Sequence, residues 1–289
     1  MPELAMMPTL FRELLGRRAL ARTPEPDLVM ADALQIADYV AGAQGDGGLE
    51  SLYHFHAVRS AGVIAGRKTV IDLACGPAVL LAQLAQLHPE TSFLGVDLSQ
   101  SMLDVAAARA ARLGLTNLYF ARADIATLDG IADGSADAVV SSMALHHLPS
   151  LEHLRACFRS IQRVLRPSGA VYLADLARLK SARSVRFLVE RERDHYAPLM
   201  ARDYERSLQA AFSLDELGRL AREELPESVR VYGTFGVRFL AVAKSPDRPL
   251  PPPLRARLRE RALRLSTRGR RDLTDLRLLF YLGGLGGAR

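Results

Sequence analysis

Cysteine is scarce in this chain of 289 residues, which contains only Cys75 and Cys157. Two cysteines, one in a predicted turn and one in a predicted helix, provide neither a disulfide framework nor the thiolate cluster of a structural zinc site. The histidines and cysteines also lack any spacing that matches a set of metal ligands. The sequence therefore predicts a protein of a reducing compartment that holds no metal.

Long apolar runs are also missing from the sequence. No run approaches the roughly 18 apolar residues that a membrane-spanning helix needs. Residues 1–22 form an apolar and basic amphipathic stretch. This stretch lacks the charged start, apolar centre and small-residue cleavage site that together mark a signal peptide. We expect a cytoplasmic protein without a membrane span.

The charge is unevenly distributed along the chain. Residues 244–289 contain 12 Lys and Arg against 4 Asp and Glu, a net charge of +8, whereas the whole chain carries +6. The preceding 243 residues therefore carry about −2. A basic tail can bind nucleic acid or an anionic membrane. A solvated helix face is the more common explanation of such a tail, and it is the one we favour.

Short apolar runs alternate with helical patterns between residues 68 and 176, which is typical of βαβ units and a parallel sheet. The predicted strands are 69–74, 92–97, 118–122, 136–143 and 170–175. Two later strand patterns, 228–232 and 237–243, are joined by a short Gly-containing segment, which predicts an antiparallel hairpin. The fold class is therefore α/β, a seven-stranded Rossmann-like sheet of five parallel strands and a C-terminal antiparallel hairpin, flanked by helices.

The helices between the strands have clear boundary signals. Helical patterns cover 79–88, 101–113 and 150–165, and a serine begins each of the last two. The third helix is expected to stop at a turn over residues 166–169. Further along, Ser213 and Glu216 have the spacing of a capping box.

Helical additions surround this core and divide the chain into predicted parts. Residues 1–66 look helical throughout and are expected to form an N-terminal lid. The core is expected to span residues 67–245, with a helical insert at 180–211. Residues 246–289 follow as a Pro-rich linker and basic C-terminal helices.

The segment from Val70 to Leu80 indicates a ligand site. A buried strand runs into Asp72, a turn of small residues follows, and an apolar helix begins. Small residues such as Gly76 let the backbone approach a ligand, and the free N–H groups of a helix start favour an anionic group. Asp97 ends the next apolar run, 21 residues after Gly76. A carboxylate there can accept hydrogen bonds from ribose hydroxyls, so the pattern predicts a nucleoside-containing cofactor.

Five segments, in this order and spacing, resemble the motifs of class I S-adenosylmethionine-dependent methyltransferases that modify small molecules. They are residues 72–76, 95–99, 123–125, 138–148 and 165–170. The resemblance covers about residues 69–243, well over half of the chain. The cofactor that it implies is S-adenosyl-L-methionine. A nicotinamide cofactor would call for Gly-x-Gly-x-x-Gly after the first strand, and the sequence lacks that pattern.

The resemblance implies a role for each residue around the methionine and ribose parts of this cofactor. Ala74 and Gly76 would let the backbone approach the methionine, with Asp72 near its ammonium group. Asp97 would accept from both ribose hydroxyls, and the backbone of Ser141 would lie near the reacting end.

The resemblance also implies an adenine site. Leu98 and Met102 would flank the base, Asp124 would accept from its exocyclic amine, and Ile125 would cover its face. One departure is that Ala74 and Ala78 stand where the family commonly has glycine. A methyl group narrows the backbone choices at these positions and puts the path of the loop in doubt.

Methyl transfer from a sulfonium is a direct displacement, so the protein must align the reactants and exclude water. A general base helps when the nucleophile is a hydroxyl, an activated carbon or a protonated amine. His146 and His147 follow the fourth strand at the ligand edge of the sheet and are the candidate catalytic residues. The alternative for both is a structural role at the start of the next helix.

Aromatic and histidine side chains outside the core motifs are candidates for contact with the acceptor. Tyr53 and His56 precede the first strand, where the family's N-terminal helices form a lid. His195 and Tyr196 lie in the helical insert. These residues would suit a pocket roof, and they would equally suit helices that pack on the sheet.

The acceptor itself is weakly specified. The family's Asn-Pro-Pro-Tyr-like segment for base or glutamine amines is absent, because Ser-Ser-Met-Ala occupies residues 141–144. This argues against a nucleic-acid partner and favours an O, N or C atom of a small metabolite in bacterial specialised metabolism. The alternatives are a peptide or RNA acceptor recruited by the basic tail, and a cofactor-binding subunit without turnover. Residues 272–282 are expected either to pack on their own domain or to form a homodimer contact.

Overall fold

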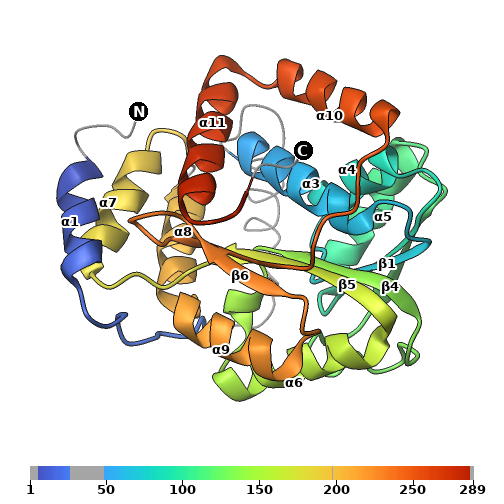
Figure 1. The fold of residues 1–289 in the computed structure, drawn as a ribbon, viewed down its shortest axis with the longest axis horizontal. Helices are drawn as coiled ribbons and strands as arrows, with labels where there is room; N and C mark the ends of the chain where they lie inside the picture. The colour runs from blue at the N-terminus through green and yellow to red at the C-terminus, as the bar shows by residue number, and fades with distance from the viewer. Residues whose placement is uncertain (1–5, 27–48, 197, 287–289) are drawn as a thin grey trace.

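The computed structural model describes residues 6–26, 49–196 and 198–286, and its centre is a seven-stranded sheet with the order β3-β2-β1-β4-β5-β7-β6 (Figure 1). β1 to β5 are mutually parallel, and β7 pairs antiparallel with both β5 and β6. The strands are β1 (Thr69–Leu73), β2 (Ser92–Asp97), β3 (Leu118–Arg122), β4 (Ala136–Ser142), β5 (Leu165–Leu176), β6 (Arg230–Gly233) and β7 (Leu240–Lys244). The predicted fold class, with its C-terminal antiparallel hairpin, is confirmed.

Helices lie on both faces of this sheet and around it. They are α1 (Met7–Leu15), α3 (Glu50–Ile64), α4 (Val79–Leu87), α5 (Gln100–Arg112), α6 (Leu151–Val164), α7 (Ala182–Glu192), α8 (Pro198–Ala210), α9 (Leu214–Glu224), α10 (Pro252–Arg264) and α11 (Thr267–Leu282), with the 3₁₀ turn η2 (Leu145–His147). α6 and α9 lie together on one face, whereas α3, α4 and α5 contact the other (Figure 1). In the described part of the chain, no helix is long and apolar enough to cross a membrane.

The predicted capping signals are largely confirmed. The Ser150 side chain accepts hydrogen bonds from backbone N–H groups in the first turn of α6, and Ser213 and Glu216 form the full capping box of α9. The α5 cap is Ser99 rather than Ser101, because the extended backbone at Ser99 aims its hydroxyl at the N–H of Met102.

Two predicted boundaries are wrong. Residues 16–26 are not helical, because two prolines fall in this stretch and its backbone instead bonds across the fold, from Leu20 N–H to Leu179 O and from Thr23 N–H to Gln209 O. The turn expected at residues 166–169 lies inside β5, which starts directly after α6. The register of β5 against β4 is irregular there, and Ser168 has a φ of +64°.

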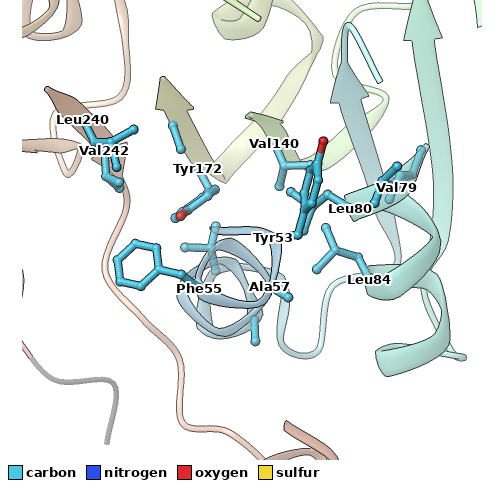
Figure 2. Close-up of a cluster of buried hydrophobic side chains, with 14 of the residues drawn as sticks. Tyr53, Phe55, Ala57, Val79, Leu80, Leu84, Val140, Tyr172, Leu240 and Val242 are labelled. Atoms are coloured by element: carbon cyan, nitrogen blue, oxygen red, sulfur yellow. The ribbon is translucent and has the colours of Figure 1, made fainter. Parts of the chain in front are cut away.

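The apolar core on the α3 side joins distant parts of the chain. Figure 2 shows α3, with Tyr53, Phe55 and Ala57, lying beside α4 and against the sheet residues Val140 and Tyr172. Each of these side chains is buried. The helix directly before β1, α3, is therefore part of the packed core as well as a candidate lid.

The C-terminal segment also belongs to this packing. The Phe280 ring of α11 is fully buried and stacks on Phe55, with 5.0 Å between the ring centroids. Leu254 and Leu258 of α10 are buried too, and Arg248 N–H donates to Gly62 O of α3. The basic tail thus carries an apolar side that covers α3. Removing residues 246–289 would expose that helix, and a homodimer contact through α11 stays a prediction.

His56 makes the stability of the fold depend on pH. Its side chain is 1% exposed, and its Nδ1 lies 2.8 Å from the Tyr172 hydroxyl. Burial lowers the pKa of His56 to about 4. The unfolded chain, with an ordinary imidazole, therefore binds more protons between about pH 4 and pH 6.5, and this contribution to stability is lost as the pH falls through that window.

We predict that the non-titrating variant His56→Gln loses less stability on acidification than the wild type. Between pH 7 and pH 5 the difference should be about 1–2 kcal/mol. Urea unfolding of both proteins at the two pH values measures it. Equal losses of unfolding free energy in the two proteins would show that His56 is not held neutral in the fold.

Candidate functional site

A cavity of about 1550 Å³ opens at the carboxyl ends of the parallel strands. In an open α/β sheet this edge is where ligands bind. The sheet-edge part of the cavity is lined by residues that end or follow β1, β2, β3 and β4. They are Ala74, Gly76, Asp97, Leu98, Ser99, Met102, Asp124, Ile125, Ala126, Met143 and Ala144.

The loop after β1 is bent sharply by left-handed backbone. Ala74, Gly76 and Ala78 have φ values of +50°, +51° and +54°. Positive φ suits glycine and crowds the Cβ of alanine. The loop thus keeps the left-handed path at both alanines, and Ala78 adopts this conformation as the N-cap of α4.

Asp97 is fixed by two backbone donors. Its Oδ2 accepts from Gly76 N–H at 2.8 Å, and its Oδ1 accepts from Ser99 N–H at 2.9 Å. A carboxylate offers about four acceptor positions, so it can accept further hydrogen bonds. Asp97 lines the cavity and is therefore an oriented acceptor for a ligand.

Asp124 is a second oriented carboxylate at the same edge. Its Oδ1 accepts from Ala126 N–H at 2.8 Å, and the residue lines the cavity. Leu98, Met102 and Ile125 line the same region. Two fixed acceptors with apolar side chains beside them fit the ribose, the amine and the flat base of an adenosine.

Two predicted cofactor residues lie behind the cavity wall. Asp72 is buried, and its burial, together with the charge of Asp97, raises the pKa of its carboxyl well above the ordinary range. Ser141 is also buried, and its hydroxyl donates to Leu73 O at 2.8 Å. Neither residue lines the cavity, so the roles predicted for them stay predictions.

His146 is buried and tied to Asp175, the penultimate residue of β5. Its Nδ1 lies 2.6 Å from Asp175 Oδ1, and its backbone N–H donates to Asp175 Oδ2 at 2.8 Å. The Nδ1 contact directs the remaining ring nitrogen, Nε2, away from Asp175, and the residue lines the cavity. Burial disfavours the imidazolium, but the charge and hydrogen bond of Asp175 outweigh it, so the pKa of His146 is raised.

A loop segment of the N-terminal region, residues 20–26, covers this histidine pair. Glu25 Oε2 lies 2.7 Å from His147 Nδ1, and Glu25 Oε1 lies 4.0 Å from His146 Nε2. Burial would raise the pKa of Glu25, but the hydrogen bond and charge of His147 lower it to about 2. Arg22 donates to His146 O at 3.0 Å and to Ala210 O, and these hydrogen bonds fix the N-terminal segment in place.

Glu25, His146 and His147 present ligand atoms within 4.8 Å of one another and so could hold a cation. A metal ion would have to displace the hydrogen bond between Glu25 and His147, and the Arg22 guanidinium places a positive charge nearby. Both features oppose a metal ion at this cluster, and the expectation that the protein holds no metal stays a prediction.

The predicted acceptor residues separate into two groups. Tyr53, His195 and Tyr196 line the cavity, but His56 faces Tyr172 in the core. The part of the cavity beyond the sheet edge is lined by both charged and apolar side chains. The charged ones include Arg191, Glu192, Arg202, Asp203, Arg206, Arg268, Arg271, Asp272 and Asp275. The apolar ones come from α1, α3, α8, the β6–β7 hairpin and α11. They include Leu10, Leu52, Met200, Phe235, Val237, Phe239, Leu276 and Leu279.

Sequence reasoning missed Asp175, Glu25 and Arg22. Asp175 had a signal, since it is an acidic residue near a strand end like Asp97. Glu25 and Arg22 had none, because only the folded chain brings residues 20–25 against η2.

Comparisons with known proteins agree with this geometry. Residues 70–169 match a family described as a methyltransferase domain. Trans-aconitate 2-methyltransferase of Deinococcus radiodurans is 40% identical over 102 residues, which are 35% of this chain and 35% of that protein. Chondramide synthase cmdD of Chondromyces crocatus is 31% identical over 118 residues, 39% of this chain and 3% of that protein. The matches thus span 35% of the first relative and 3% of the second.

Solved structures share the fold. An O-methyltransferase family protein from Burkholderia thailandensis has a TM-score of 0.55 and 19% identity, over 83% of this chain and 68% of that one. A SAM-dependent methyltransferase from Aquifex aeolicus has a TM-score of 0.53 and 17% identity, over 74% and 98%. At this level of identity the likeness concerns the fold alone.

We predict that Ala74→Gly raises the free energy of unfolding by about 0.5–1 kcal/mol, because glycine adopts a positive φ without the crowding of a Cβ. The matched control is Ala108→Gly on the exposed side of α5, which should lower stability by about 1 kcal/mol. Chemical unfolding compares the variants. Equal destabilisation by both substitutions would mean that the loop does not take the left-handed path.

Proposed function

Since the chain carries a class I S-adenosylmethionine-dependent methyltransferase domain, we propose that it transfers a methyl group from S-adenosylmethionine to an O, N or C atom of a small metabolite. The observation that carries this proposal is the pair of oriented carboxylates, Asp97 and Asp124, beside apolar side chains at the sheet edge. When bound, the cofactor supplies an activated methyl group on a sulfonium.

The residues of the sheet edge hold the cofactor in this proposal. Asp97 accepts from the ribose hydroxyls while Gly76 and Ser99 keep its carboxylate in place. Asp124 accepts from the adenine amine, and the apolar side chains beside it cover the base. A buried carboxyl whose pKa is raised, as at Asp72, would regain its charge near an ammonium group.

His146 takes the proton of the acceptor. Asp175 holds Nδ1, so the lone pair of Nε2 is left for the acceptor's hydroxyl, amine or activated carbon. Asp175 then stabilises the imidazolium that forms. Glu25, 4.0 Å from Nε2, adds a second negative charge near it. His147 holds Glu25 in position and acts through it.

The acceptor class follows from the outer part of the cavity. Its apolar side chains lie beside Tyr53, His195 and Tyr196 and beside charged residues such as Arg202 and Arg206. Such a lining favours a small molecule that has both apolar surface and polar or charged groups. A role in bacterial specialised metabolism agrees with the bacterial origin of the curated relatives.

Asp97→Ala should weaken S-adenosylmethionine binding about 100-fold or more, because it removes the charged acceptor of two hydroxyl hydrogen bonds. Isothermal titration calorimetry measures the Kd. The control is Asp104→Ala, an exposed carboxylate on α5 that bonds to Gln100. Because Asp97 also supports the loop, Asp97→Asn and circular dichroism test the fold separately. Wild-type affinity in a folded Asp97→Ala protein would refute the cofactor site.

His146→Gln should lower turnover about 100-fold or more while the Kd for S-adenosylmethionine changes little. A panel of alkylated phenols, amines and β-dicarbonyl compounds, assayed by S-adenosylhomocysteine release, supplies the acceptor. The control is His153→Gln, an exposed histidine that also lines the cavity. Tight cofactor binding without release from any acceptor would favour a non-catalytic subunit. Undiminished turnover in His146→Gln would exclude the residue as the base.

The pH profile separates the role of Asp175 from simple support. Activity requires neutral His146, so the rate should rise with pH through the raised pKa of this residue. Asp175→Asn removes the charge that raises this pKa. The rate of the variant should therefore begin to rise at lower pH than that of the wild type and should reach a lower maximum. If the rate rises at the same pH in the variant and in the wild type, Asp175 does not set the pKa of the base.

A further inference from the structure

The outward face of α1 is unusually apolar for a helix at the molecular surface. Phe11, Leu14 and Leu15 are 56%, 56% and 79% exposed, and with Met7 they follow the i, i+4, i+7, i+8 spacing of one helix face. Figure 1 shows α1 at the outer edge of the molecule beside α7. Several bulky apolar side chains together on a surface mark a site of interaction.

This exposure is fixed by the way the helix is anchored. On the opposite side of α1, Thr9 and Glu13 are buried. The Glu13 carboxylate accepts from Lys180 N–H at 3.0 Å, and Lys180 Nζ donates to Glu13 O at 2.8 Å. These contacts bind α1 to the segment before α7, so the helix cannot turn its apolar face inward without losing them.

The charges around the face are predominantly basic. Arg17 and Arg18 follow the helix after Gly16 and are exposed, and the neighbouring α7 exposes Arg183 and Arg186 together with Glu190. The only acidic residue of α1, Glu13, is buried on the other side. A face of exposed apolar side chains flanked by arginines is the composition of helices that lie on anionic bilayers. A second copy packed symmetrically on this face would bring like charges together.

The same helix forms a wall of the cavity. Met6, Met7 and Leu10 line it, and the exposed apolar side chains Phe235 and Leu282 belong to its lining as well. We propose that the outer face of α1, with Phe11, Leu14, Leu15, Arg17 and Arg18, docks the protein on an anionic membrane surface, and that an acceptor with apolar surface reaches the cavity from there. The docking does not depend on the proposed methyl transfer, whereas the path of the acceptor does.

Sedimentation of the full chain with phosphatidylcholine vesicles that contain phosphatidylglycerol tests the docking. The triple variant F11Q/L14Q/L15Q keeps good helix formers and removes the apolar face. We expect it to lose at least about tenfold in bound fraction, and R17E/R18E to bind less and to lose the salt dependence of wild type. The matched control is L263Q, which replaces an apolar side chain of α10 that is 75% exposed and should bind like wild type.

Each alternative has its own result. Unchanged binding by the triple variant would overturn the proposal, as would equal wild-type binding to vesicles of phosphatidylcholine alone. A wild-type protein that stays off the vesicles but forms a dimer, which the triple variant cannot form, would assign the face to a second copy instead. Circular dichroism, measured for every variant, reports correct folding. Vesicle binding in a protein that does not bind S-adenosylmethionine would leave the docking intact and refute only the proposed function.

Discussion

The hydrogen bonds that Asp97 accepts from Gly76 and Ser99 are the interaction on which the site depends. They join the end of β2 to the loop after β1 and to the start of α5. The Cys75 N–H bond to Val96 O adds a second link between the same two strand ends. The parallel sheet brings these segments to one edge, but the carboxylate sets the path of the loop and presents an oriented acceptor to the cavity. A single side chain thus connects the fold to ligand binding.

A second carboxylate near a strand end organises the other half of the cavity. Asp175 of β5 accepts from the backbone and the ring of His146, and so holds the residue that follows β4. Glu25 and Arg22 then close the histidine pair from the N-terminal side. The residues proposed to hold the cofactor and those proposed to transfer the proton therefore come from neighbouring strands of the same edge. In the proposal, this arrangement keeps the methyl donor and the base on two sides of one cavity.

The sequence was sufficient for the sheet because its strands are short apolar runs with clear boundaries. β2 and β3 have the predicted bounds, and the antiparallel pair β6 and β7 was also expected. Asp97 and Asp124 could be placed because a strand end fixes where a side chain lies. The contacts of residues 16–26 could not be predicted, because the hydrogen bonds of Leu20, Arg22 and Thr23 go to residues more than 100 positions away.

The C-terminal helices show a different limit. Their arginines dominate the composition, so the segment resembles a solvated tail. Only the fold shows that Leu254, Leu258 and Phe280 share a side that covers α3. Periodicity can show which side of a charged helix is apolar. It does not show which surface of the protein that side packs against.

The most direct test of this account is a crystal structure of the protein with S-adenosylhomocysteine. We predict that the ribose hydroxyls lie within hydrogen-bond distance of the Asp97 carboxylate, that the adenine amine reaches Asp124, and that the sulfur faces the part of the cavity that His146 lines. A nucleoside bound elsewhere, or a ribose held by groups other than Asp97, would contradict the central claim.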